Sequence, residues 1–300
     1  MTTESDWIAY VNGEYVKQSE AKISIFDHVV LYGDGVFDTW TSKNGYIFHF
    51  ERHTDRLFRS AHAFMIDVPV SKEELKKIII KVCEMNGAPD QYIKVLVTRG
   101  VGARPLLSPA GCKPGLIVFT RPPLSSVDPG REDKEVHAMI VSVRRTPPQC
   151  LDPKIKNLNY ANNVMAKIQA MQAGMDEAIF LDIEGYVNEA TAYSIFIARE
   201  GVLYTPTADS ILESVTRETV FEMAKQEGIR VVERRLTPSD LYTAEELFFA
   251  ATAGGVVPIS SVDGRKIANG KPGPISRKLS QIYGDMMAKG IHGTPYKVKK

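Results

Sequence analysis

The chain has 300 residues, of which 44% are hydrophobic and 24% are charged, and its formal net charge is +1. This is the composition of an ordinary globular protein, and the length favours two domains over one. A charge so close to zero argues against nucleic acid or an anionic membrane as a partner.

The sequence also lacks the signals of secretion, membrane insertion and structural metal binding. The longest apolar runs, such as 138–143, have the length of a strand, and no basic segment followed by an apolar one stands at the start of the chain. Three dispersed cysteines predict neither a disulfide framework nor a zinc site. We therefore expect a cytoplasmic protein without a metal ion.

Turn residues divide the first part of the chain into short elements. The pair Asn12-Gly13 predicts a hairpin over 7–16, because both positions of a two-residue turn need positive φ angles. Gly33 and Gly35 indicate a tight turn or a close approach of the backbone to a ligand. The other elements predicted here are strands on either side of 43–45, helices over 51–64 and from Ser71 to about Gly87, strands over 92–98 and 116–119, and a loop over 99–104.

The stretch 121–133 has the proline, glycine and charge density of a connection between domains. We therefore expect a small N-terminal α/β domain over 1–121, a linker over 122–134 and a larger C-terminal domain over 135–300. In the second domain the pattern predicts a strand over 136–143, a helix over about 160–173 with Val164, Ile168 and Met171 at helical spacing, a meander of short strands over 177–204, a helix from Ser214 to about Gln226, and a strand over 247–251.

The stretch 151–163 holds two lysines, Lys154 and Lys156, among apolar and amide side chains just before a predicted helix. A lysine that loses hydration has a lowered pKa and a nucleophilic amine, which Schiff-base chemistry with an aldehyde cofactor requires. Taken by itself, the stretch fits a loop with two solvated lysines better, because lysines are seldom buried.

Two other places have the chemistry to bind such a cofactor. Glu189 ends a strand of buried character, so its carboxylate needs a partner, either an arginine or the protonated ring nitrogen of a cofactor. Ser214 is the natural N-cap of a helix, where the first amides, those of Val215 and Thr216, and the threonine hydroxyl suit a phosphate.

Two more features fit phosphate or ligand binding. Arg56 lies at the edge of an apolar helix stripe, where its guanidinium can point at a phosphate or belong to a solvated face. The loop Thr252–Gly255 consists of small residues and allows a ligand to contact backbone amides.

Six motifs in this order resemble those of the class IV pyridoxal-phosphate aminotransferases, and the match covers roughly 7–283. The motifs are Tyr32–Phe37, His53–Leu57, Lys154–Tyr160, Gly185–Glu189, Ile211–Arg217 and Thr252–Pro258. The resemblance implies a mixed α/β (α+β) two-domain fold of the D-amino-acid aminotransferase type. It also implies pyridoxal 5'-phosphate as cofactor, an amino donor and a 2-oxo acid as substrates, and a homodimer.

The resemblance also implies roles for single residues. Lys156 corresponds to the catalytic lysine that binds the cofactor and moves the proton, and Lys154 is the alternative with the poorer spacing. The implied cofactor contacts are Arg56 at the phosphate, Tyr160 at the phenolic oxygen, Glu189 at the pyridine nitrogen, Leu212 under the ring, and Val215, Thr216 and Thr252 as further phosphate donors. The implied substrate contacts are Tyr32, Phe37, Arg104, Thr252 and Ala253.

The motifs disagree about the donor. Tyr32, Phe37 and the lysine stretch resemble prokaryotic branched-chain aminotransferases, although Thr39 and Thr41 stand where those enzymes usually have glycine and arginine. Arg104, the segment 143–148 and the loop Thr252–Gly255 resemble D-amino-acid or (R)-amine transaminases instead. The prediction is therefore a ping-pong transaminase for a branched-chain, D-amino-acid or (R)-amine donor. An aminodeoxychorismate lyase and a non-catalytic protein that kept the fold are the alternatives.

Overall fold

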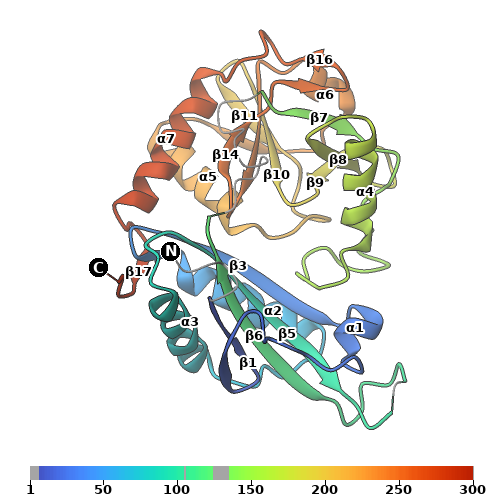
Figure 1. The fold of residues 1–300 in the computed structure, drawn as a ribbon. Helices are drawn as coiled ribbons and strands as arrows, with labels where there is room; N and C mark the ends of the chain where they lie inside the picture. The colour runs from blue at the N-terminus through green and yellow to red at the C-terminus, as the bar shows by residue number, and fades with distance from the viewer. Residues whose placement is uncertain (1–6, 105, 124–134, 300) are drawn as a thin grey trace. The chain divides into compact units, whose positions relative to one another are not determined.

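The computed structural model describes residues 7–104, 106–123 and 135–299 (Figure 1). Contacts divide the chain into two compact units. Unit 1 comprises Met1–Leu124, Ile155–Tyr160 and Met286–Lys300, and unit 2 comprises Ser125–Lys154 and Ala161–Asp285. The division differs from the predicted domain limits because Ile155–Tyr160 and Met286–Lys300 belong to unit 1, whereas the prediction placed both segments in the C-terminal domain. Most of the predicted linker, 124–134, lies outside the described residues.

Unit 1 is built on a seven-stranded antiparallel sheet of order β17-β4-β3-β5-β6-β1-β2. Its core lies between this sheet and two helices, α2 and α3, where Trp40, Leu57 and Ile79 are buried. Its elements are β1 (Ile8–Val11), β2 (Glu14–Lys17), α1 (His28–Tyr32), β3 (Gly35–Lys43), β4 (Tyr46–Phe48), α2 (Phe50–Ala63), α3 (Lys72–Asn86), β5 (Gln91–Val101), β6 (Lys113–Arg121) and β17 (Gly293–Pro295).

The turn chemistry predicted for unit 1 is confirmed. Asn12 and Gly13 both have positive φ angles in the turn between β1 and β2, and Ser71 accepts a hydrogen bond from the Glu74 amide at the start of α3. The loop predicted over 99–104 is confirmed for 102–104 and was wrong for 99–101, because β5 continues across a register shift to Val101. The short helix α1 was not predicted. Its five residues are too few to show a helical period, and Asp27 caps it.

Unit 2 contains two five-stranded sheets, of order β12-β11-β10-β13-β14 and β16-β15-β7-β8-β9. Its core includes Ile179, Ile195 and Leu247, which come from both sheets. Its elements are β7 (His137–Ile140), α4 (Ala161–Gln172), β8 (Glu177–Leu181), β9 (Val187–Ala190), β10 (Ser194–Arg199), β11 (Val202–Thr205), α5 (Val215–Gln226), β12 (Val231–Glu233), α6 (Pro238–Tyr242), β13 (Glu246–Ala251), β14 (Gly255–Pro258), β15 (Ser261–Val262), β16 (Arg265–Lys266) and α7 (Pro274–Ala288), whose last residues belong to unit 1.

Two features of unit 2 differ from the prediction. The strands over 177–204 do not form one meander, because β8 and β9 lie in one sheet and β10 and β11 in the other. Every residue of β8 and β9 is buried, so their sequences carry no alternation that would indicate which sheet face they belong to. The helix α4 is confirmed, but Val164, Ile168 and Met171 are exposed and its buried face is made of smaller residues.

The mixed α/β fold class is confirmed by these three sheets and their helices. Among the described residues no helix is both long enough and apolar enough to cross a membrane.

Candidate functional site

The middle of the lysine stretch, Ile155–Tyr160, belongs to unit 1 and forms a short addition to strand β3. The Phe37 amide donates to the Lys156 carbonyl oxygen at 2.9 Å, and the Leu158 amide donates to the Gly35 carbonyl oxygen at 2.8 Å. The Ser60 hydroxyl oxygen, on α2, accepts from the Lys156 amide at 3.1 Å. Three backbone contacts therefore fix the position of Lys156 relative to the sheet and α2.

Both glycines of the predicted tight turn take part in this docking. Gly33 has a φ of 67° and ends α1 in the left-handed conformation. A Cβ atom at Gly35 would lie 2.8 Å from the Leu158 side chain and 2.8 Å from the Val97 carbonyl oxygen. The close approach that the sequence indicated is therefore to the chain's own lysine segment.

The side chain of Lys156 has an aromatic environment within unit 1. Its Nζ donates to the Tyr160 hydroxyl at 3.4 Å and lies 4.4 Å from the ring centre of Phe37. The rings of Phe37 and Tyr160 contact each other edge to face, with their centres 5.1 Å apart. Lys154 is exposed, and its amide bonds to the Asp152 carboxylate in a local turn. The two lysines therefore differ in their surroundings, and the role of Lys156 as the reactive lysine stays a prediction.

Arg56 is the centre of a buried charge cluster on the other face of β3. Its Nε and Nη2 donate to the two Asp38 oxygens at 2.8 and 2.7 Å, and His53 Nδ1 lies 2.8 Å from Asp38. Burial disfavours ionisation of Asp38, but the charge of Arg56 and the hydrogen bonds from Arg56 and His53 outweigh it and hold the pKa of this carboxyl well below its usual range. Asp38, which sequence reasoning did not assign a role, therefore orients the guanidinium.

The other predicted substrate residues of unit 1 lie on different elements. Tyr32 is the last residue of α1, and its ring centre lies 5.1 Å from that of His28. Arg104 lies in the exposed loop between β5 and β6. The role of Arg104 at the substrate stays a prediction.

In unit 2, Glu189 is buried near the end of β9 and has two partners. Arg145 Nε lies 2.6 Å from its Oε1, and the Leu212 amide donates to its Oε2 at 3.3 Å. The arginine partner that the sequence left open is therefore Arg145, which also donates to Asn162 Oδ1 at 3.4 Å. The contact with Leu212 places the predicted ring-packing residue beside the predicted partner of the ring nitrogen.

The N-terminus of α5 has the predicted form. Ser214 caps the helix by accepting from the Arg217 amide at 3.2 Å, and Val215 and Thr216 occupy the first two helical positions. The first amides of a helix have no partner within it and carry a partial positive charge, which favours a phosphate.

A tyrosine that sequence reasoning missed links this helix end to the second predicted loop. Tyr283, on α7, makes a hydrogen bond with Thr216, and its ring lies 2.8 Å from the position that a Cβ atom at Gly255 would occupy. Burial raises the pKa of Tyr283, which keeps it a neutral phenol. It therefore braces both the helix N-terminus and the turn that carries Thr252 and Ala253. No local pattern could reveal it, because α7 is distant in sequence.

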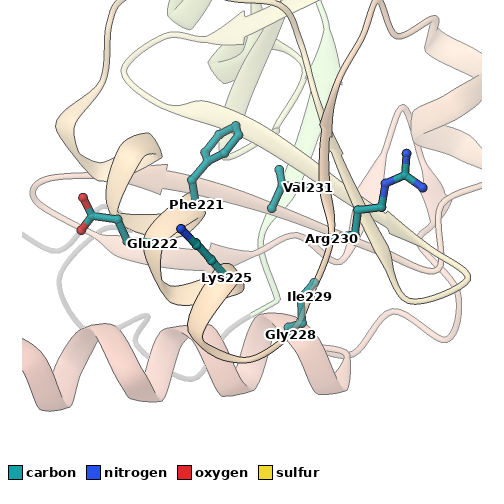
Figure 2. A pocket seen from close by; sticks show the side chains of 7 residues that line it. All are labelled: Phe221, Glu222, Lys225, Gly228, Ile229, Arg230 and Val231. Atoms are coloured by element: carbon teal, nitrogen blue, oxygen red, sulfur yellow. The ribbon is translucent and has the colours of Figure 1, made fainter.

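A separate cavity of about 470 Å³ lies at the C-terminal end of α5 and the start of β12 (Figure 2). Phe221, Ile229 and Val231 provide its apolar lining, and Glu222, Lys225 and Arg230 are charged. None of the predicted site residues lines it.

The family follows from comparison with known proteins. A family model described as amino-transferase class IV matches residues 35–262, which includes Lys156, Glu189 and the N-terminus of α5. The chain belongs to the class IV aminotransferases. Most of the chain is covered by this match, and helix α7, which provides Tyr283, lies outside it.

Individual relatives cover the chain nearly completely. A putative branched-chain-amino-acid aminotransferase of Methanocaldococcus jannaschii is 45% identical over 284 residues, 93% of this chain and 96% of the relative. The structure resembles the branched-chain aminotransferase of Thermoproteus uzoniensis with norvaline, with a TM-score of 0.88, 33% identity and coverage of 96% and 98%. It also resembles the T.th. branched-chain amino acid aminotransferase with pyridoxamine 5'-phosphate, with a TM-score of 0.89, 31% identity and 96% coverage of both chains.

This class IV aminotransferase uses pyridoxal phosphate and transfers an amino group from a donor to a 2-oxo acid. Within each unit, taken by itself, the residues present suit that cofactor. Unit 1 has an amine in aromatic surroundings, and unit 2 has a buried carboxylate and a capped helix N-terminus. The lyase and the non-catalytic protein are not favoured, since the relatives are aminotransferases.

The buried Asp38–Arg56 pair leads to a stability prediction. Asp38→Asn leaves the Arg56 charge buried without its carboxylate, so we expect the free energy of unfolding to fall by about 3 kcal/mol or more. Asp55 lies beside Arg56 on α2 and forms an exposed ion pair with Lys72 of α3, so Asp55→Asn should lower the free energy of unfolding by less than about 1 kcal/mol. Denaturant unfolding followed by circular dichroism measures both.

The pH dependence of the same variants provides a second check. Because the pKa of Asp38 is lowered on folding, its contribution is present above the unfolded-state value of about 3.9 and is lost as the pH falls below it. The difference between the wild-type protein and Asp38→Asn should therefore shrink below about pH 4. Equal losses in Asp38→Asn and Asp55→Asn at neutral pH would contradict the role given to Asp38.

Proposed function

We propose that this aminotransferase takes an aliphatic L-amino acid of the branched-chain type as donor and binds its cofactor through Lys156. The observation that carries the proposal is the position of the Lys156 amine against the Phe37 ring and the Tyr160 hydroxyl. An apolar aromatic surface beside the reactive amine suits an aliphatic side chain, which loses water when it packs there. The branched-chain names of the relatives support the same donor class.

The cofactor supplies an aldehyde and a ring that accepts electrons during the reaction. Lys156 binds the aldehyde through its amine and afterwards moves the proton at the substrate carbon. The Tyr160 hydroxyl, 3.4 Å from the Lys156 Nζ, orients that amine and contacts the phenolic oxygen of the cofactor. These roles extend the resemblance, and the contacts of Lys156 within unit 1 support them.

Charged and helical groups provide the remaining cofactor contacts. Glu189 pairs with the protonated ring nitrogen, supported by its burial and its ion pair with Arg145. Arg56 binds the phosphate, and Asp38 fixes the plane of its guanidinium. In unit 2, Leu212 packs under the ring, and Val215, Thr216 and Thr252 donate to the phosphate, supported by the N-terminus of α5.

Each unit, taken by itself, also has residues that we assign to the substrate. Phe37 and Tyr32 provide aromatic surface, and Thr252 and Ala253 offer backbone amides in the turn after β13. Arg104 is proposed as a receptor for the carboxylate of acidic substrates, because a guanidinium binds a carboxylate with two hydrogen bonds.

The assignment of Lys156 is tested by the visible absorption of the purified protein. Lys156→Ala removes the amine that binds the cofactor, so the absorption of a lysine-linked pyridoxal should disappear. Lys154→Ala removes an exposed lysine of the same loop and should keep the band. The opposite result for the two variants would transfer the assignment to Lys154.

The donor is tested with a panel of L-leucine, D-alanine and (R)-1-phenylethylamine, each with 2-oxoglutarate or pyruvate as acceptor. We expect L-leucine to give the largest kcat/KM, because its side chain suits the Phe37 surface. A larger value for D-alanine or the amine would contradict the branched-chain proposal.

An Arg104→Ala variant on the same panel should lose more activity with 2-oxoglutarate than with pyruvate.

We also propose that the chain forms a homodimer. Apolar side chains are exposed on and beside α1 of unit 1, among them Ile25, Phe26 and Val30, and an uncovered surface of this kind is typical of an interface. Sedimentation should therefore give about twice the chain mass of 33.3 kDa. Val30→Asp should weaken the dimer, whereas Ile183→Asp, at an exposed position of unit 2, should not. A monomeric wild-type protein would contradict the proposal.

A reducing compartment such as the cytoplasm is proposed from the cysteines. Cys83, Cys112 and Cys150 are all free, and the thiol of Cys83 is buried. Thiol titration of freshly isolated protein should find three reduced cysteines, and a disulfide would contradict the proposal.

A further inference from the structure

Two lysines of unit 1 share one aromatic ring. Lys94 Nζ lies 4.6 Å from the ring centre of Phe37, and Lys156 Nζ lies 4.4 Å from the same centre. The two nitrogens are therefore at most about 9 Å apart, where like charges still repel by more than thermal energy at an effective dielectric constant of about 20. Antiparallel pairing of β3 with β5 produces this arrangement, because Lys94 pairs with Thr39, two residues from Phe37 on the same sheet face.

The carboxylate nearest to Phe37 along β3 does not offset this repulsion. That group is Asp38, which faces the opposite side of the strand and is engaged by Arg56 and His53. Burial lowers the pKa of His53, so the imidazole is neutral at neutral pH and adds no charge. The phenols that face the lysines are Tyr160 and Tyr92, and burial raises the pKa of Tyr92, which keeps it neutral.

Lys94 itself responds to the second lysine. Its pKa lies below the ordinary value, first because the side chain is partly buried and then because of the charge of Lys156. A Coulomb interaction between two groups is reciprocal, so the charge of Lys94 acts on the Lys156 amine with the same sign.

We propose that Lys94 activates Lys156 electrostatically: its ammonium disfavours a second positive charge and so raises the fraction of the Lys156 amine that is neutral and nucleophilic. This rests on the proposed role of Lys156 as the lysine that binds the cofactor. Activation of a lysine by a neighbouring cation is an established way to obtain an amine that reacts with carbonyl groups near neutral pH. Lys94 does not need to touch the reacting atoms for this effect, because it acts on the Lys156 amine through its charge alone.

The test compares three variants of the full chain. Lys94→Met removes the charge at similar length, and Lys94→Arg keeps it. Lys81→Met is the matched control, because Lys81 also lies over an aromatic ring of unit 1, 4.2 Å from the centre of Tyr15, on a different helix and strand. Two readouts are used, and neither is catalytic activity.

The first readout is the pH midpoint at which Lys156 of the cofactor-free chain becomes reactive to acetic anhydride, followed by peptide mass spectrometry. Removing the positive neighbour should move this midpoint upward in Lys94→Met by about one pH unit at low ionic strength, and by less in ~1 M salt. Lys94→Arg and Lys81→Met should keep the wild-type midpoint. An unchanged midpoint in Lys94→Met, or an equal shift in Lys81→Met, would overturn the inference.

The second readout is the pH midpoint of the visible absorption of the pyridoxal-loaded protein, which depends on the proton of the linking nitrogen. This midpoint should also move upward in Lys94→Met and stay at the wild-type value in Lys94→Arg and Lys81→Met. A wild-type protein without any lysine-linked absorption would contradict the proposed role of Lys156, while the acetylation midpoints would still decide whether Lys94 acts on Lys156. The two failures are therefore distinguishable. Thermal unfolding of Lys94→Met identifies a variant that has lost its fold, and Lys94→Arg then still tests whether charge alone is sufficient.

Discussion

The docking of Ile155–Tyr160 onto strand β3 is the constraint on which the unit 1 part of the site depends. Two backbone hydrogen bonds join the segment to Gly35 and Phe37, and the Ser60 hydroxyl on α2 accepts a third. Gly35 is needed because any Cβ atom would meet the Leu158 side chain and a carbonyl oxygen of β5. The same hydrogen bonds that hold the segment place the Lys156 amine against Phe37, so the amine that we propose to react is positioned by backbone hydrogen bonds and not by a flexible loop.

Each unit pairs a buried acid with an arginine. In unit 1 Asp38 holds Arg56 by two hydrogen bonds, and in unit 2 Arg145 holds Glu189 by one short contact. An unpaired buried charge is costly, so each pair satisfies a folding requirement and at the same time fixes the direction of a side chain that we propose to bind the cofactor. The lysine pair at Phe37 is the opposite case, because two like charges are held near each other. Such an arrangement costs stability and has a use when one of the two groups must be neutral to react.

Elements with local signals were predictable and those defined by distant contacts were not. The positive φ angles at Asn12 and Gly13 and the Ser71 and Ser214 caps follow from neighbouring residues, so the sequence indicated them. The chain passes from one sheet to the other between β9 and β10. Because β9 is buried on both faces, the periodicity of its sequence does not indicate which sheet it joins. The sequence did not show which face of α4 is exposed, for a related reason. Its large apolar residues share one face, but the face that packs in the core carries the small residues.

The sequence by itself determined the order of the motifs and the capped helix end at Ser214, because these depend on residue type and short spacings. For the same reason it also predicted Lys156, and not Lys154, as the lysine that binds the cofactor. Only the tertiary structure decided that Arg145 is the partner of Glu189 and that Tyr283 braces Thr216. It also decided that Lys94 shares the Phe37 ring with Lys156. These partners are 44, 67 and 62 residues apart in the chain, and a contact at such separation arises from sheet pairing and packing, which no local pattern encodes.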